Sequence, residues 1–289
     1  MSDEKKKPDT REGIVFPYPE SGFFDDDLPK GVLSPSGFNT FRRCPRQFEY
    51  AYILGLRKPP VIAMIKGTAI HKGAEVVHAY TIEHGTPLAL DGGIQAVSDT
   101  FDREKDDVED ATKEEKGKVK DAAISNFRIY YRDAIPLIKP VAAEKPFAMK
   151  VGTVPFRGVI DLVDAVPGEY ALEDDPEQPP PLVEVVSDLK TTTRTWPAQK
   201  LEQEPQLTFY ALAEDTDRVR VDFLLDLKSG CKYSPKRALR DLNSKRLLIE
   251  DAEQVAKFIK KGFFPRCDPT TWACTEKFCG YYADCRGPK

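Results

Sequence analysis

The sequence has no long hydrophobic segment. No stretch approaches the ~20 apolar residues that a membrane-spanning helix needs, and the opening residues, MSDEKKKPDT, lack the apolar core of a secretory signal. The chain nevertheless has 289 residues, 40% of them hydrophobic, which is enough to bury a sizeable core. We therefore expect a soluble, cytoplasmic protein.

Other absences narrow the class of protein. The phosphate-binding pattern G-x-x-x-x-G-K-(S/T) does not occur, so the chain is not itself a helicase. Six cysteines are too few for a secreted disulfide scaffold of this length, and clustered cysteines in a reducing compartment more often bind metal or carry out redox chemistry. The net charge of −4 does not by itself indicate a nucleic-acid binder, although a local basic groove would be sufficient for one.

The N-terminal part of the sequence changes character near residue 33. Residues 1–30 are polar, charged and rich in proline and glycine, so we expect a flexible arm there. Ser34 and Pro35 form a good helix start, a capping hydroxyl followed by a proline in the first turn. Aromatic residues then recur at helical intervals and are predicted to lie in the core: Phe38, Phe41, Phe48 and Tyr52.

Further along, helical and strand patterns alternate. The predicted helices lie at 64–85, within 91–133, at 203–215 and at 251–262, and the predicted strands are a hairpin at 141–166 and single strands at 182–192 and 219–228. An acidic, proline-rich loop occupies residues 167–181. This order favours an α/β fold with a small mixed sheet flanked by helices. We expect residues 31–289 to form one domain, with a helical insert at about 90–135 and a C-terminal segment at 262–289.

The predicted strands carry the chemistry. Asp161 lies in the stretch FRGVIDL, and the stretch VSDLKTT contains Asp188 and Lys190. Because side chains alternate along a strand, Asp188 and Lys190 share one face and Leu189 lies opposite. Carboxylates on neighbouring strands can hold a divalent ion, which activates water and stabilises charge on a phosphate, and lysine adds a point charge.

A single D-x-K triplet is weak evidence, because the pattern occurs by chance and Asp226-Leu227-Lys228 repeats it in this chain. The simpler interpretation of any one triplet is an exposed strand edge with a salt bridge worth less than ~1 kcal/mol. The order of several motifs is more specific. GTAIH ends at His71, GVID at Asp161 and DLK at Lys190, and QLTFY then runs from Gln206 to Tyr210.

This ordered set resembles the RecB-type branch of the PD-(D/E)XK nuclease superfamily, over about residues 33–286. The resemblance implies a restriction-endonuclease-like core and hydrolysis of DNA with one or two Mg²⁺ or Mn²⁺ ions. It implies that the metal ligands are His71, Asp161, Asp188 and the main-chain carbonyl of Leu189, and that Asp161, Asp188 and Lys190 are catalytic. It further implies that Gln206 and Tyr210, on one face of a helix, contact DNA.

The other histidines have no counterpart in the resemblance. His78 and His84 are therefore interpreted as structural or surface residues. Glu75 lies four residues after His71 on the same helix face, so it is a candidate for a supporting or ligand carboxylate.

A subset of this family, which includes the nuclease domain of AddB and CRISPR-associated exonucleases, carries an iron–sulfur cluster. The resemblance assigns a [4Fe–4S] cluster to Cys44, Cys274, Cys279 and Cys285, which would join the two ends of the domain. The gap after Cys274 holds four residues where the family often has two, so Cys267 stays an alternative to Cys274. A structural Cys₄ zinc site is the competing interpretation.

The resemblance also implies the substrate. Cluster-bearing relatives act largely as DNA exonucleases, often on single-stranded ends, so we expect an exonuclease of recombination, repair or phage DNA processing in the cytoplasm of a bacterium or a phage-infected host. Arg42, Arg43 and Arg46 flank Cys44 and are either a solvated basic face or phosphate contacts. Two alternatives stay open: a CRISPR-adaptation-type or helicase-associated nuclease subunit that acts through partners such as a recombinase or helicase, and a non-catalytic, cluster-bearing DNA-binding module.

Overall fold

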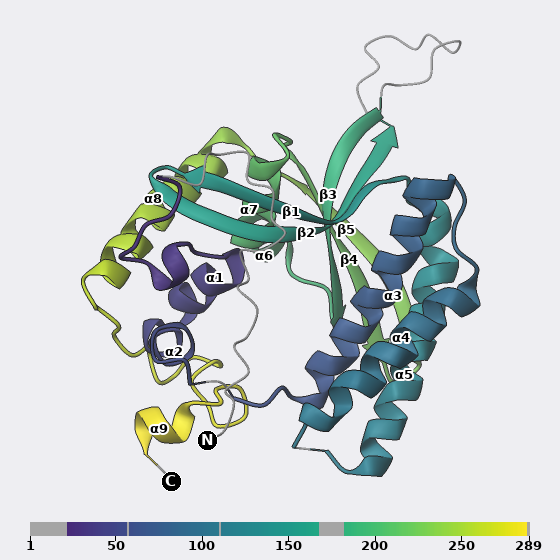
Figure 1. Ribbon diagram of the computed structural model, residues 1–289, viewed down its shortest axis with the longest axis horizontal. Helices are drawn as coiled ribbons and strands as arrows, with labels where there is room; N and C mark the ends of the chain where they lie inside the picture. The colour runs from purple at the N-terminus through teal and green to yellow at the C-terminus, as the bar shows by residue number, and fades with distance from the viewer. Residues whose placement is uncertain (1–21, 57, 110, 168–181, 288–289) are drawn as a thin grey trace, which may run out of the picture.

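A five-stranded mixed sheet forms the centre of the protein (Figure 1). The computed structural model describes residues 22–56, 58–109, 111–167 and 182–287. The strand order is β1-β2-β3-β4-β5, in which β3 and β4 are parallel and the other neighbours are antiparallel. The strands are β1 Pro140–Val151, β2 Val154–Pro167, β3 Leu182–Thr192, β4 Arg218–Leu227 and β5 Gly230–Leu239.

Helices cover both faces of this sheet, so the predicted α/β class is confirmed. The longer helices are α1 Pro35–Arg43, α3 Ile62–His84, α4 Leu90–Glu104, α5 Lys113–Asp133, α7 Pro205–Ala213 and α8 Leu242–Lys260. The shorter ones are η1 Pro29–Gly31, α2 Pro45–Phe48, η2 Glu49–Ile53, η3 Lys105–Asp107, η4 Ile135–Leu137, α6 Ala198–Gln203 and α9 Tyr282–Arg286.

Two hydrophobic cores lie on opposite sides of the sheet. In the first, α1, α7 and α8 pack on the sheet, with Phe38 and Phe209 in edge-to-face contact at 5.3 Å between ring centroids. In the second, α3, α4 and α5 pack together around Phe101 and Phe127. Figure 1 shows these two helical groups on either side of the strands. The predicted helical insert is therefore a part of the second core.

Local sequence signals explain the main boundaries. The Ser34 hydroxyl accepts a hydrogen bond from the Gly37 amide and caps α1, as predicted. Helix α3 ends at Gly85, whose φ of 73° is accessible to glycine at little cost. The hairpin also forms as predicted, and its two-residue turn at Gly152–Thr153 fixes the register of β1 against β2.

Three details differ from the prediction. Strand β5 was not predicted, and it pairs with β4 along most of its length. Tyr52 is 41% exposed rather than in the core, because it lies on the outer side of buried Phe48. Within the expected N-terminal arm, residues 22–30 are ordered and bury Phe23 and Leu28. The rest of that arm, and the loop predicted at 167–181 apart from Pro167, lie outside the described residues.

Among the described residues, no helix combines the length and the apolar character needed to cross a bilayer.

Candidate active site

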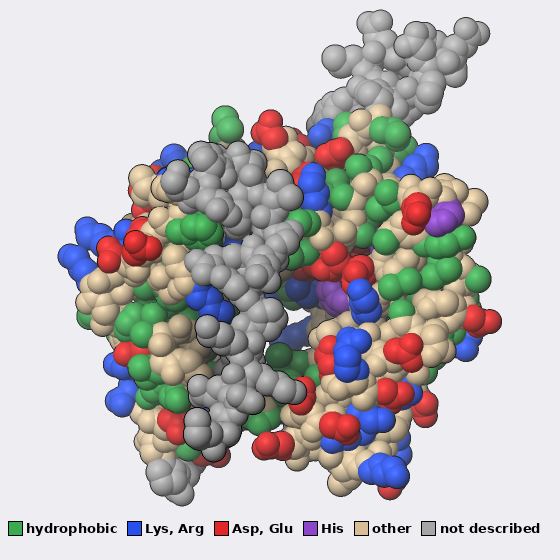
Figure 2. Space-filling model, viewed as in Figure 1, with side chains coloured by type: hydrophobic (Ala, Val, Ile, Leu, Met, Phe, Trp, Pro, Cys, Tyr) green, Lys and Arg blue, Asp and Glu red, His purple; other side chains and the backbone are tan. Residues whose placement is uncertain are grey.

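Helices α3 and α4 and strands β1, β2 and β3 line an open cavity of about 660 Å³. Its lining includes His71 from α3, Glu144 from β1, Asp161 from β2 and Lys190 from β3. Acidic, basic and histidine side chains gather in a hollow between the two halves of the molecule (Figure 2). Residues that are distant in the sequence thus meet at one polar site.

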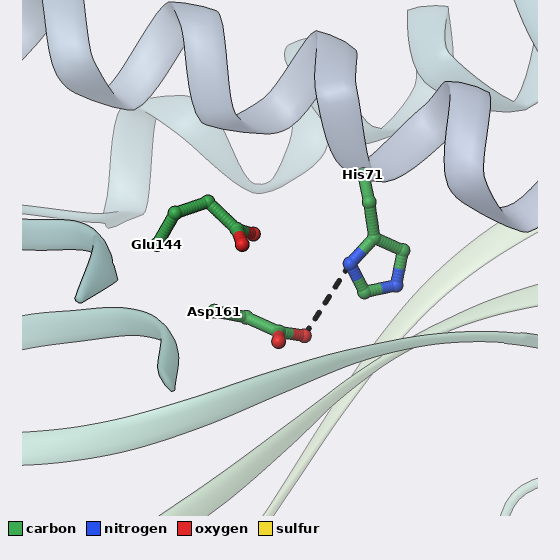
Figure 3. A group of neighbouring side chains, drawn as sticks. All are labelled: His71, Glu144 and Asp161. Atoms are coloured by element: carbon green, nitrogen blue, oxygen red, sulfur yellow. Dashed lines mark ion pairs between the residues drawn. The ribbon is translucent and has the colours of Figure 1, made fainter. Parts of the chain in front are cut away.

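Three side chains in this cavity offer donor atoms to a single ion. One ligand atom each from His71, Glu144 and Asp161 lie within 4.8 Å of one another. Figure 3 shows the three side chains converging, with His71 reaching down from α3 towards the two carboxylates. The imidazole Nδ1 lies 3.4 Å from Asp161 Oδ2. Two carboxylates and one imidazole are a suitable donor set for Mg²⁺ or Mn²⁺, so the residues fit the metal that the motifs imply.

The backbone of Leu189 completes this side of the cavity. Its amide donates a hydrogen bond to Asp161 Oδ2 at 3.0 Å, which links β3 to the carboxylate on β2. Its carbonyl oxygen lies 2.8 Å from His71 Nε2. The carbonyl that the sequence resemblance assigns to the metal is therefore beside the imidazole, next to the three side-chain donors.

Glu144 is the member of this group that the sequence analysis missed. The flanking pairs Ala143–Leu162 and Lys145–Ile160 place it opposite Asp161 across the hairpin. Its φ of 47° is unusual for a non-glycine residue in a strand, and such backbone strain is concentrated at functional sites. Burial, and then the negative charge of Asp161, raise the pKa of Glu144 to about 7.

Asp188 and Lys190 form a second group on β3. The Lys190 ammonium donates to Asp188 Oδ1 at 2.7 Å, and the Lys190 side chain is one-third exposed whereas Asp188 is buried. Burial raises the pKa of Asp188 to about 7, against the influence of Lys190. The alternation predicted from the sequence is confirmed, because both side chains lie on one face of the strand.

Gln206 and Tyr210 reach this group from α7. Gln206 Nε2 lies 3.1 Å from Asp188 Oδ1 and 2.7 Å from the Tyr210 hydroxyl. Tyr210 is only 3% exposed. Gln206 and Tyr210 thus hold Asp188 in position, and the Tyr210 ring is too buried in this structure to contact a substrate.

The remaining candidates are not among the three grouped donors, although Glu75 lines the same cavity. Asp226, of the second D-x-K triplet, pairs with Lys66, and Glu75 pairs with Lys72 at 2.6 Å. His78 is buried and lies 2.8 Å from the Tyr130 hydroxyl, and burial lowers its pKa to about 4. His84 contacts the Tyr80 ring at the end of α3. His78 and His84 are therefore a core and a surface residue, as expected.

The cysteines converge at a different place. All six are free thiols in the described chain, and five of them line one cavity: Cys44, Cys267, Cys274, Cys279 and Cys285. Cys44 lies between α1 and α2, whereas the other four come from the C-terminal segment. The structure thus brings the two ends of the domain together, as the resemblance implies.

Cys267 lies among these thiols, although the sequence analysis treats it only as an alternative to Cys274. Burial, and then the neighbouring Cys44 side chain, raise its pKa to about 11. Cys231 is elsewhere, on β5. Five sulfurs therefore surround the cavity, one more than a Cys₄ site uses.

Three arginines line the same cavity: Arg46, Arg266 and Arg286. Arg286 Nη2 lies 3.4 Å from Cys274 Sγ, and the buried Nε atoms of Arg46 and Arg286 have no hydrogen-bond partner among the described residues. Cysteine thiolates are the usual ligands of an iron–sulfur cluster and nearby N–H donors can bond its sulfurs, so the residues fit that group. Of the other basic candidates, Arg42 pairs with Asp251 and Arg43 with Gln47.

Comparison with known proteins agrees with the fold. The family model of the PD-(D/E)XK nuclease superfamily matches residues 32–286, and the chain belongs to this superfamily. No curated protein matches the chain.

Two solved structures are similar in outline. A protein from Eubacterium rectale named "Putative exonuclease" has 10% identity and a TM-score of 0.48, over 84% of this chain and 86% of its own. SSO0001 has 12% identity and a TM-score of 0.33, over 76% of this chain and 84% of its own.

Proposed function

We propose that this protein is a divalent-metal-dependent DNA exonuclease that hydrolyses phosphodiester bonds at single-stranded ends. The observation that carries the proposal is the single cavity in which His71, Glu144 and Asp161 converge beside the carbonyl of Leu189. Lys190 borders the same cavity with its ammonium held by Asp188. Membership of the nuclease superfamily supports phosphodiester hydrolysis as the reaction.

Each residue has a distinct task in this proposal. His71, Glu144 and Asp161 hold the ion with the Leu189 carbonyl, and Asp188 is the further metal ligand that the resemblance implies. A bound Mg²⁺ or Mn²⁺ supplies an activated water and Lewis-acid stabilisation of the phosphate. Asp188 fixes the Lys190 ammonium, which is placed to stabilise the negative charge that develops on the phosphate oxygens. Gln206 and Tyr210 keep Asp188 in position.

The cysteine cavity completes the proposal. We assign Cys44, Cys274, Cys279 and Cys285 as ligands of a structural [4Fe–4S] cluster, with Cys267 as the alternative to Cys274. The support is the convergence of these thiols and the unpaired Nε atoms of Arg46 and Arg286 beside them. The cluster clamps α1 and α2 to the C-terminal segment and takes no part in hydrolysis. A role in recombination, repair or phage DNA processing is consistent with such an enzyme.

A nuclease assay tests the catalytic assignment. End-labelled linear DNA and closed circular DNA are incubated with the wild type and with Lys190→Ala, with Mg²⁺ or Mn²⁺. We expect the wild type to degrade the linear DNA from its ends and to leave the circle intact. Loss of a preorganised charge at the phosphate lowers rates by about 10²–10³-fold, so Lys190→Ala should be nearly inactive.

A matched variant controls for loss of a lysine at the protein surface. Lys228→Ala removes the lysine of the second D-x-K triplet, which does not line the cavity, and should keep full activity. Equal cleavage by the wild type and Lys190→Ala would overturn the assignment of Lys190. Cleavage of closed circles would replace exonuclease with endonuclease action.

A further inference from the structure

A further cavity of about 500 Å³, the Tyr52 cavity, lies between the segment Pro29–Ser34, the α2–η2 turn and the beginning of β2. Among the described residues that line it, none is an aspartate or a glutamate, whereas three are basic and three are aromatic: Lys30, Lys58, Arg157, Phe48, Tyr52 and Tyr281. Although the net charge of the protein is −4, the basic side chains favour an anion in this cavity, and the aromatic side chains favour a planar ring.

Tyr52 supplies an aromatic surface in this cavity. Its ring stacks on Phe48, with 4.8 Å between centroids and 19° between planes, and Phe48 is only 1% exposed. Tyr52 itself is 41% exposed. A core residue thus fixes one face of the Tyr52 ring in place, while the side chain stays accessible. A rigid, accessible aromatic ring is the kind of surface on which proteins stack an unpaired base.

The basic side chains surround this ring. Arg157 is half-buried on β2, and its amide bonds the Leu33 carbonyl, which fixes the strand to the wall of the cavity. Lys58 is held over the Tyr281 ring at 5.5 Å and pairs with Asp284 at 2.9 Å. Lys30 is exposed on the opposite wall. Arginine and lysine side chains that line a cavity can contact phosphate groups, although Lys58 is already paired with the carboxylate of Asp284.

Strand β2 connects this cavity to the catalytic one. Side chains alternate along a strand, so Arg157, Val159 and Asp161 lie on one face of β2, opposite buried Phe156 and Ile160. Four residues of strand span about 13 Å, and Val159 between them is 42% exposed. A DNA strand with a phosphate at Asp161 can therefore follow this face to Arg157.

We propose that the Tyr52 cavity is a binding subsite for the unpaired DNA strand, in which a base stacks on Tyr52 and a phosphate binds Arg157. The inference rests on the proposed nuclease function for the identity of the strand that reaches Asp161. A duplex does not fit this role, because its bases are stacked on each other and do not expose a free face to Tyr52. The subsite thus selects single-stranded ends.

Binding without catalysis tests the subsite. Fluorescence anisotropy with a labelled single-stranded oligonucleotide in EDTA measures affinity while no cleavage occurs. Tyr52→Ala should weaken binding by about tenfold or more, the usual effect of losing one stacked base, whereas Tyr52→Phe should bind normally. Arg157→Gln should weaken binding and lower the slope of log affinity against log salt by about 0.7, the effect of one phosphate contact.

Matched variants outside the cavity control for the loss of an aromatic or basic surface residue. Phe263→Ala removes an exposed aromatic ring, and Arg237→Gln removes an exposed arginine of β5. Both should bind as the wild type does. Tyr52→Ala should also leave the affinity for blunt duplex DNA unchanged. The melting temperature of the Tyr52→Ala protein shows whether this variant is folded.

The outcomes separate the subsite from the nuclease function. Normal single-strand affinity in folded Tyr52→Ala and Arg157→Gln overturns the subsite, even if the wild type cleaves DNA. An equal loss of duplex affinity in Tyr52→Ala also overturns it, because stacking of an unpaired base would not explain that result. Loss of single-strand affinity in both variants supports the subsite, even if the wild type does not cleave.

Discussion

Glu144 shows how one residue completes the candidate metal site. Its carboxylate lies with Asp161 and His71 within 4.8 Å, and its backbone adopts a φ of 47° that few non-glycine residues adopt. A conformation that costs free energy persists only if the surroundings enforce it. Holding a third ligand atom in the cavity is a physical reason for this strain.

Glu144→Gln should therefore weaken divalent-ion binding. The amide keeps the shape of the side chain but removes its negative charge, so we expect Mn²⁺ affinity to fall by about 10–100-fold. Isothermal titration calorimetry on the DNA-free protein measures the change. Glu75→Gln is the matched control, because Glu75 is on the same cavity wall but pairs with Lys72. Equal losses in the two variants would show a general charge effect and contradict a specific role for Glu144.

The ionisation of Glu144 also predicts a pH dependence. Its pKa is about 7 in the folded, metal-free protein, whereas an unfolded glutamate has a pKa near 4.3. Between these values the folded state binds more protons than the unfolded state, so the contribution of Glu144 to the free energy of unfolding falls as pH rises from about 4 to 7.

Melting temperatures at pH 5.5 and pH 8 test this sign. Without metal, Glu144→Gln should gain stability relative to the wild type at pH 8 and gain less at pH 5.5. Mn²⁺ should raise the melting temperature of the wild type more at pH 8, because Glu144 is then ionised and ready to bind. A metal effect that is larger at pH 5.5 would contradict the assignment.

At the scale of elements, a buried polar network holds the strands of the site in place. Arg220 on β4 forms ion pairs with Asp164 on β2 and Asp222 on β4, and all three side chains are at most 4% exposed. Ser187 on β3 and Tyr233 on β5 donate hydrogen bonds to Asp222. The network therefore joins four strands beside the cavity.

Removing the central cation of this network should be costly. Arg220→Ala leaves two buried carboxylates without their partner, so we expect a loss of about 3–5 kcal/mol in the free energy of unfolding. Arg218→Ala is the matched control on the same strand, since Arg218 pairs with half-exposed Asp217 and should contribute less than about 1 kcal/mol. Urea denaturation measures both, and equal losses would contradict the network's role.

Some residues of the candidate site could be predicted from the sequence, whereas others could not. His71, Asp161 and Lys190 were found because each lies within a short motif, and periodicity then gave the helices and strands that carry them. Glu144 carries no motif, and its place opposite Asp161 depends on the hairpin register, which the turn at Gly152–Thr153 sets. A register built outward from that turn would have found it.

Other features depend on tertiary packing and could not be derived from local patterns. Tyr52 fits a helical pattern of buried aromatics, but Phe48 is the buried residue of the pair and Tyr52 stacks on its outer side. Strand β5 is largely polar because it is an edge strand with most side chains exposed, so it lacks the alternating pattern that predicts a strand. Tyr210 was expected at the substrate, yet it is buried behind Asp188.

At the scale of the whole molecule, residues 46–56 contact the C-terminal segment near the cysteines. The Arg46 amide bonds the Pro265 carbonyl, and the Tyr281 hydroxyl bonds the Leu56 carbonyl at 2.5 Å. Tyr50 and Tyr281 also stack, with ring centroids 5.4 Å apart. Lys58 also pairs with Asp284, and Phe264 packs against Phe41 and Phe48. The C-terminal segment nevertheless has little regular structure besides α9 among the described residues. A metal group bound by thiolates of both ends would therefore contribute much of the attachment.

The proposed cluster can be tested through this attachment. Cys44→Ser removes the one N-terminal thiol in the cavity, so the purified protein should lose its iron and sulfide and the broad visible absorbance of a cluster. Its C-terminal segment should then be cut faster in limited proteolysis, because loss of the group frees one end of a loop of about 230 residues. Cys231→Ser is the matched control, since Cys231 lies outside the cavity.

Comparing Cys267→Ser with Cys274→Ser identifies the fourth ligand, because only the true ligand should be needed for full iron content. A colourless wild type that contains zinc would replace the cluster with a Cys₄ zinc site, and a Cys44→Ser variant with full metal content would contradict the clamp altogether.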